Sequence, residues 1–204
     1  MNFEQHLLRD VELLIETHRE VYQGPGRPLS VLTRSGVFLL CAAWELYCEE
    51  VLMECFELVL QGAEEPMELP EGVRRTLANA VKSEKNELAA LRLAGEGWRE
   101  FLREKVRTKI EQLNTPNAVN ISDLFARNVG VDVHPLIDQH EAALAAFISK
   151  RGDIAHRGAQ AGHVSINDLA ADYDYICALV RDFDNHLIEP VQAIAGRRPW
   201  NRRQ

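Results

Sequence analysis

One stretch of this sequence limits the fold more than any other: residues 30–60, which read SVLTRSGVFLLCAAWELYCEEVLMECFELVL. Apolar residues dominate it, no proline interrupts it, and its charged residues argue against a membrane span. An apolar helix of this length must be covered by other elements, so it has to lie at the centre of a bundle. The sequence therefore predicts an all-α fold built around one long central apolar helix.

The rest of the chain also has helical rather than strand periodicity. The last helix, over residues 165–191, repeats apolar residues in steps of four and three, with Ser165 as its N-cap. The helix before it, over residues 134–158, is closed by Gly158. We expect a single domain over residues 1–190, followed by a basic, flexible tail over residues 191–204.

The net charge and the absence of targeting patterns limit the classes of partner and the location that we expect. The chain has 204 residues and a formal charge of −8, which disfavours coating of nucleic acid through bulk charge but leaves room for a local basic groove. The N-terminus carries acidic residues where a signal peptide needs a basic end. Since no uncharged apolar run is long enough to span a membrane either, we expect a cytoplasmic protein without a membrane partner.

The four cysteines are interpreted as buried core thiols. Cys41, Cys48 and Cys55 are seven residues apart on the long apolar helix. That spacing separates neighbours by about 10 Å, too far for a disulfide. Cys177 lies in the last helix, and none of the four has the Cys-x-x-Cys spacing of a metal site.

The segment ISKRGDIAHRG, residues 148–158, contains an arginine and a histidine separated by four residues. On a helix, Arg151 lies in the middle of the apolar face, where an unpaired guanidinium is costly to bury. Arg151 must therefore meet a carboxylate or line a polar cleft that receives an anion. Asp153 lies close enough to His156 on the helix to orient the imidazole.

The same spacing occurs a second time, at Arg181 and His186. Arg181 lies about 140° from the centre of the apolar stripe on the last helix, so it faces water. We interpret this second pair as ordinary surface.

Glu45 is a further anomaly, on the long apolar helix. It lies opposite a group of glutamates that mark the solvent-facing side, namely Glu50, Glu54 and Glu57. A carboxylate on the buried side of a helix needs a partner. Glu45 therefore either forms a structural ion pair or faces the same cleft as Arg151 and His156.

Taken in order along residues 30–190, these segments resemble the HEPN superfamily, most closely HEPN-like nucleases of the RiboL-PSP type. The resemblance rests on SGVFLLCAAWELYCEEVL, TPNAVNISDLFARNVGVDV and HEAALAAFISKRGDIAHRG, followed by one final helix. It implies an all-α domain, a homodimer with two motifs facing one cleft, and RNA cleavage without a metal. The family motif falls on Arg151 and His156. The residue after the arginine is often Asn, Asp or His in the family, whereas this chain has Gly152, so Asp153 has to substitute.

The residues fit that chemistry without a cofactor. Histidine moves protons at neutral pH, and arginine offers paired donors to phosphate. His134, Asp138 and His140 do not have the spacing of a helical metal-ligand pair, so we expect no metal site. Arg99, Arg103 and Arg107 recur at four-residue spacing as possible RNA contacts, although the glutamates beside them favour an ordinary solvated face.

Two functions therefore remain. The chain is expected to be an endoribonuclease that attacks RNA with its own 2′-hydroxyl, as a toxin or phage-defence component whose partner is an antitoxin or defence protein. The alternative is a non-catalytic HEPN interaction module that binds another protein.

Overall fold

The computed structural model describes residues 3–21, 29–113 and 115–203, and within these ranges the regular elements are all helical. The predicted all-α class is confirmed. The α-helices are α1 (Phe3–Val21), α2 (Ser30–Gly62), α3 (Glu71–Ser83), α4 (Gly97–Ile110), α5 (Ala118–Asn128), α6 (His134–Arg157) and α7 (Ile166–Ala195). Short 3₁₀-helices occur between them: η1 (Pro66–Glu68), η2 (Ala89–Leu93) and η3 (Gly158–Gln160).

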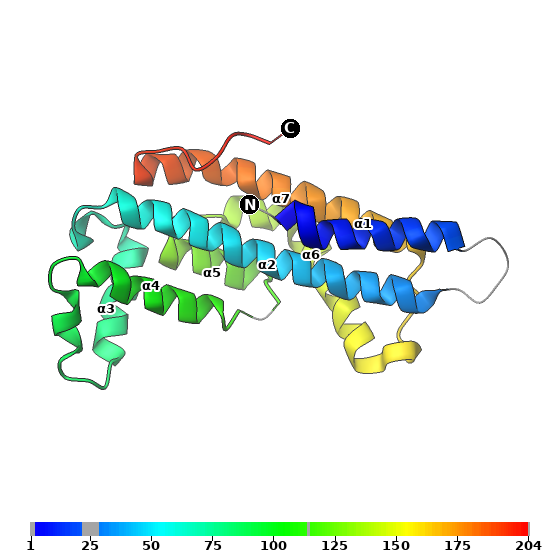
Figure 1. The fold of residues 1–204 in the computed structure, drawn as a ribbon, viewed down its shortest axis with the longest axis horizontal. Helices are drawn as coiled ribbons and strands as arrows, with labels where there is room; N and C mark the ends of the chain where they lie inside the picture. The colour runs from blue at the N-terminus through cyan, green and yellow to red at the C-terminus, as the bar shows by residue number, and fades with distance from the viewer. Residues whose placement is uncertain (1–2, 22–28, 114, 204) are drawn as a thin grey trace.

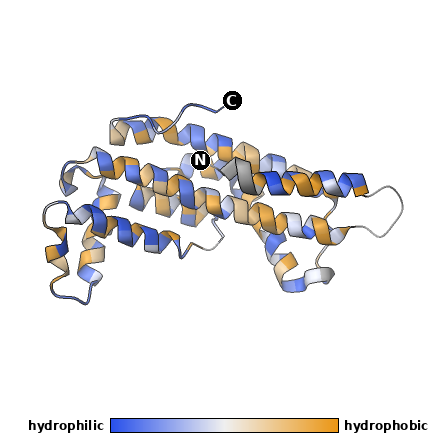
Figure 2. Ribbon diagram, viewed as in Figure 1, coloured by the Kyte–Doolittle hydropathy of each residue, from blue (hydrophilic) through white to orange (hydrophobic). Residues whose placement is uncertain are grey.

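The long helix α2 lies at the centre, as its composition predicts. It contacts α1, α4, α5, α6 and α7, and Figure 1 shows it running the length of the bundle. Trp44 and Tyr47 of α2 stack with ring centroids 5.7 Å apart, and Phe183 of α7 meets both rings edge-on. Hydrophobic residues recur along α2 and α7, whereas the visible side of α4 is mostly hydrophilic (Figure 2). Apolar side chains on several faces of α2 therefore require neighbours all round it.

The cysteines of α2 are core thiols, as predicted. Cys41, Cys48 and Cys55 are buried, and Cys177 of α7 is half-buried. Burial raises the pKa of Cys41 to about 12 and raises the pKa of Cys48 well above its ordinary value. Both thiols therefore stay protonated at neutral pH.

The last helix is longer than expected and crosses the predicted domain end at residue 190. Ser165 caps α7, accepting from the backbone of Asp168 while the Asp168 carboxylate accepts in return from the backbone of Ser165. The helix runs through Pro190 to Ala195, and Gly196 closes it with a φ of 71°. Apolar residues after position 190 explain the extension, because Val191 and Ala195 are buried against the rest of the bundle.

The basic segment after α7, for which the sequence predicts a flexible tail, is hydrogen-bonded along α7 in the structure. Arg203 pairs with the fully buried Asp184 at 2.6 Å, and Asn185 exchanges two hydrogen bonds with the Arg203 backbone. The indole of Trp200 donates to the Asp184 carbonyl at 3.0 Å. The acidic and amide side chains on α7 thus give the basic tail a defined place.

The two ends of the bundle carry different elements. Figure 1 shows α3 and η2 projecting at one end, and the last turns of α6 with η3 projecting at the other, where α2 and α7 begin. Among the helices of the described ranges, none is long and apolar enough to cross a membrane.

Candidate active site

The Arg151–His156 pair lies in the projecting part of α6. The helix remains α-helical through Arg157 and ends at Gly158, whose φ of 52° lies in the left-handed region. The last turn that Asp153 and His156 need for their predicted geometry is therefore present. The pair sits at the end of the bundle where α2 begins (Figure 1).

Arg151 is half-buried and has no carboxylate partner. Its Nε is shielded from water with no hydrogen-bond acceptor, and among the described residues no acidic group lies within ion-pair distance of it. The guanidinium carbon lies 5.8 Å from the ring centroid of Phe38 on α2. Of the two environments predicted for Arg151, the structural ion pair is therefore not formed, and the guanidinium remains available to an anion.

Phe38 was not recognised as part of this site from the sequence. A helical projection groups it with the residues flanking Glu45 on the buried side of the long helix, but its side chain is 37% exposed. It is the one aromatic residue among the exposed large hydrophobic residues of the described ranges. Phe38 faces α6 because of how α2 and α6 pack, and no pattern in the sequence indicates that packing.

Glu45 is half-buried and has no cationic partner within the part of the chain that the structure describes. Its charge raises the pKa of Cys41, whereas that of Arg151 lowers it. The charges of Glu45 on α2 and Arg151 on α6 therefore both lie within electrostatic reach of the Cys41 thiol. The structural ion pair, one of the two interpretations of Glu45, is not formed, and its position facing the cleft stays a prediction.

A second cation anchors the motif helix. Lys150, next to Arg151, donates to both carboxylate oxygens of Asp172 on α7, at 2.8 and 2.6 Å. Burial raises the pKa of Asp172 even though the Lys150 ammonium opposes the shift. This contact fixes α6 against α7 one residue before Arg151, and the sequence analysis did not identify it.

His156 and Asp153 are both exposed. No ion pair joins them in the structure, so the orienting role of Asp153 remains a prediction. Asp153 instead lines a cavity of about 130 Å³ together with Lys150 and His163, among others. The imidazole of His156 is thus free to meet a substrate or a second copy of the chain.

The second Arg-x4-His pair is on the surface, as predicted. Arg181 is exposed, with Asp182 3.8 Å from its Nε. The ring of His186 lies 3.2 Å from the backbone oxygen of Asp132. Neither side chain approaches the motif on α6, which makes Arg181 a matched control.

The arginines of α4 are largely occupied within the chain. Arg99 donates to the carbonyl of Ala63 at 2.5 Å, just past the end of α2, and pairs with Glu96. Arg103 binds both carboxylate oxygens of Glu57 and also pairs with Glu100. Arg107 is exposed. Contact of these three residues with RNA stays a prediction, and Arg99 and Arg103 would have to exchange partners to make it.

The residues considered for a metal site do not converge. His134 and Asp138 form an exposed pair at 2.8 Å, while His140 lies 3.8 Å from Asp182. No group of three or more histidine, cysteine or acidic side chains in the described ranges is arranged to hold a metal ion.

The family of the chain follows from a match over most of its length. The family described as RiboL-PSP-HEPN matches residues 5–189, which contain the whole candidate site. The chain belongs to the RiboL-PSP-HEPN family. No curated protein and no solved structure matches it.

Within the range matched by the RiboL-PSP-HEPN family, the Arg151–His156 helix α6 comes directly before the last α-helix, α7. It is compatible with a nuclease and equally with a HEPN module that binds without cutting. In this RiboL-PSP-HEPN chain the site offers an unpaired guanidinium and an exposed imidazole. These are the two groups that phosphoryl transfer on RNA would use.

Proposed function

We propose that the protein is an endoribonuclease that cuts RNA through attack by the 2′-hydroxyl and needs no metal ion. The observation that carries the proposal is Arg151: a half-buried guanidinium whose Nε is shielded from solvent and has no acceptor among the described residues. A desolvated cation of this kind favours an anion as its missing partner. A phosphate of RNA fits, because the guanidinium has the Phe38 ring beside it and no carboxylate among the described residues pairs with it.

The two side chains divide the chemistry. The 2′-oxygen of a nucleotide attacks the adjacent phosphorus, the bond to the 5′-oxygen breaks, and a 2′,3′-cyclic phosphate forms. His156 takes the proton from the 2′-hydroxyl, and an imidazolium returns one to the departing 5′-oxygen. Arg151 offsets charge that builds up on the phosphoryl oxygens, with Asp153 and Glu45 in supporting roles.

The proposal includes a symmetric homodimer with both motifs lining one cleft. HEPN domains often dimerise, and next to the motif α6 carries a stripe of small residues that are exposed except for the half-buried Gly152. Small side chains let two helices approach closely. The members of this stripe, in steps of three or four residues, are Ala142, Ala145, Ser149 and Gly152.

Purified protein on a panel of structured and unstructured RNAs tests the activity. We expect fragments ending in 2′,3′-cyclic phosphate or its hydrolysed form, in equal yield with and without EDTA. Cleavage that EDTA abolishes, or fragments with 5′-phosphates, would contradict the mechanism. Light scattering tests the dimer, and a strict monomer would contradict the shared cleft.

One set of observations favours the second candidate, a non-catalytic module that binds another protein. The chain carries a formal charge of −8, and the guanidiniums of Arg99 and Arg103 already have partners within the chain. Neither of these two arginines can then hold RNA without giving up its present partner. Absence of cleavage on every RNA tested, together with a dimer whose partner binding survives His156→Ala, would favour this module.

The cellular role proposed for the nuclease is that of a toxin or phage-defence component restrained by a partner protein. Expression of such an enzyme arrests growth, and His156→Ala relieves the arrest if RNA cleavage causes it. Arrest that persists in His156→Ala would contradict this role while leaving the cleavage test intact.

A further inference from the structure

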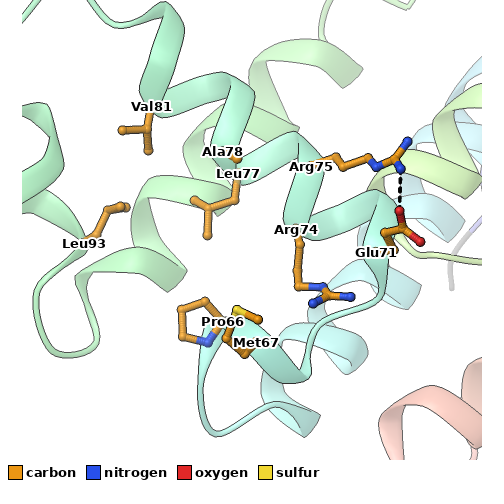
Figure 3. Close-up of a pocket in the computed structure, with 9 residues that line it drawn as sticks. All are labelled: Pro66, Met67, Glu71, Arg74, Arg75, Leu77, Ala78, Val81 and Leu93. Carbon is orange, nitrogen blue, oxygen red and sulfur yellow. Dashed lines mark hydrogen bonds and ion pairs between the residues drawn. The ribbon is translucent and has the colours of Figure 1, made fainter.

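A cavity of about 640 Å³ opens at the other end of the molecule, far from α6. Its walls come from three separate elements: Pro66 and Met67 of η1, Leu77 and Val81 of α3, and Leu93 of η2. Figure 3 shows Leu93 facing α3 across the cavity, with Pro66 and Met67 closing its lower side. The volume falls within the range of about 300–1,000 Å³ typical of small-molecule sites.

Three charged side chains interrupt this apolar lining, namely Glu71, Arg74 and Arg75, and only Arg74 among them has no ion-pair partner in the described residues. Arg74 of α3 lines the cavity, and Figure 3 shows its guanidinium directed toward Pro66 and Met67. Its Nε is shielded from water and has no acceptor, and no ion pair to it is formed among the described residues. The neighbouring Arg75 also lines the cavity, but its guanidinium is already bound to Glu71 at 2.5 Å (Figure 3). Arg74 is therefore a partly desolvated cation at one end of an apolar cavity, without a counter-ion.

The geometry points to a binding site for a small amphiphilic carboxylate, that is, an apolar chain or ring that carries a single carboxylate. The carboxylate pairs with Arg74, and the apolar part lies along Leu77 and Val81 against Leu93. Arg74 and Val81 are separated by about 10 Å along the helix axis, which suits a medium-length alkyl chain. This site is independent of the nuclease proposed for α6.

Titration calorimetry with three ten-carbon probes tests the site: decanoate, neutral decanol and cationic decyltrimethylammonium, each below its micelle-forming concentration. We expect decanoate to bind most tightly, decanol more weakly and the cation not at all. Arg74→Met should reduce decanoate affinity about tenfold or more, because a charge-assisted hydrogen bond is lost. The same variant should leave decanol affinity within about twofold, since the apolar walls are unchanged.

Arg75→Met is the matched control, because it removes the same charge from the same helix and the same cavity, at a residue whose guanidinium is already paired with Glu71. Decanoate affinity should change less than about twofold in this variant. Ala78→Trp fills the cavity from an exposed position on α3 and should block both decanoate and decanol without loss of helicity. When decanoate is added to the parent protein, amide chemical shifts should change around residues 66–93.

Three results would overturn the site. The first is no binding of any probe at millimolar concentration. The second is equal loss of decanoate affinity in Arg74→Met and Arg75→Met, which would indicate a general charge effect. The third is a change in oligomeric state in Ala78→Trp without probe binding to the parent protein, which would make the cavity an interface between copies.

Discussion

Two half-buried arginines approach α2 from opposite ends of the bundle, and their surroundings differ. Arg103 on α4 reaches the C-terminal part of α2, where both oxygens of Glu57 accept from it at 2.6 and 3.0 Å. Arg151 on α6 reaches the N-terminal part, where it meets the ring of Phe38 and no carboxylate. An arginine from a neighbouring helix thus meets α2 at each end, and it is paired with a carboxylate at one end and unpaired at the other.

The difference separates an arginine that stabilises the fold from one that is available for chemistry. The hydrogen bonds that Arg103 donates to Glu57 and Glu100 raise the pKa of Arg103 above its ordinary value, and the Glu57 contact joins α4 to α2. Removing Arg103 leaves the half-buried carboxylate of Glu57 without a cation, whereas removing Arg151 leaves no acid unpaired. The fold should therefore depend on Arg103, and the activity on Arg151.

The largest expected effect is on RNA cleavage. His156→Ala should lower the rate about 10²- to 10⁴-fold, because general acid–base catalysis is lost. Arg151→Ala should lower it about 10²- to 10³-fold, because charge on the phosphoryl oxygens is no longer offset. The double variant should lose far less than the product of the two, since both residues serve one step. Single-turnover cleavage of one RNA measures all three.

Arg181→Ala is the control for this test, because Arg181 has the same spacing to a histidine but lies on the surface. Its cleavage rate should stay within about twofold of the parent. A loss in Arg181→Ala as large as that in Arg151→Ala would show that the lost activity reflects net charge rather than the site.

The next largest effect is expected on stability, at the ion pair of Arg203 with Asp184, whose side chain is fully buried. Burial and the adjacent Asp184 charge raise the pKa of Tyr47, so its hydroxyl stays protonated and donates to Asp184 at 2.8 Å. Arg203→Met leaves this carboxylate with a buried charge and should lower the free energy of unfolding by about 2–3 kcal/mol. Urea unfolding measures the loss. In an Asp184→Asn background the same change should cost less than about 1 kcal/mol, and an equal cost in both backgrounds would contradict the pairing.

The comparison of Arg103 and Arg151 can be tested directly by stability. Arg103→Met should lower the free energy of unfolding by about 1–2 kcal/mol, between the values for exposed and buried pairs, because both partners are less than a third exposed. Arg151→Met should change it by less than about 0.5 kcal/mol, since only a contact with Phe38 is lost. Urea unfolding of the two variants side by side is the measurement. A larger loss in Arg151→Met would make Arg151 structural and remove the main support for the nuclease.

Periodicity was enough to predict the all-α class, the central position of α2 and the helix that carries Arg151. Those features depend on the spacing of apolar residues along one segment, which the sequence displays directly. The buried cysteines of α2 and the exposed Arg181 follow from the same reasoning. The motif itself is recognisable because its residues are neighbours on one helix.

The contacts that decide each arginine's role join residues far apart in the chain, and periodicity does not report them. Glu57 lies 46 residues from Arg103, and Asp172 lies on a different helix from its partner Lys150. The composition of the basic tail predicts flexibility, because composition does not show that Asp184 on α7 can pair with Arg203. Exposure of Phe38 likewise depends on how far α6 projects, which follows from packing rather than from sequence spacing.

The smallest effect is expected for Gly152→Ala, which tests whether a second copy of the chain packs against α6 beside Arg151. A Cβ added at this half-buried helical position meets no atom within 4 Å in the single chain. Gly152→Ala should therefore raise the free energy of unfolding of the protomer by about 0.5–1 kcal/mol, because alanine restricts the unfolded chain and favours the helix. If a second copy packs across α6, the new methyl group meets that copy and weakens the dimer. Urea unfolding at low protein concentration and sedimentation at several concentrations separate the two effects. A more stable protomer with unchanged dimerisation would move the interface away from Gly152, and Arg151 would then face solvent and substrate alone.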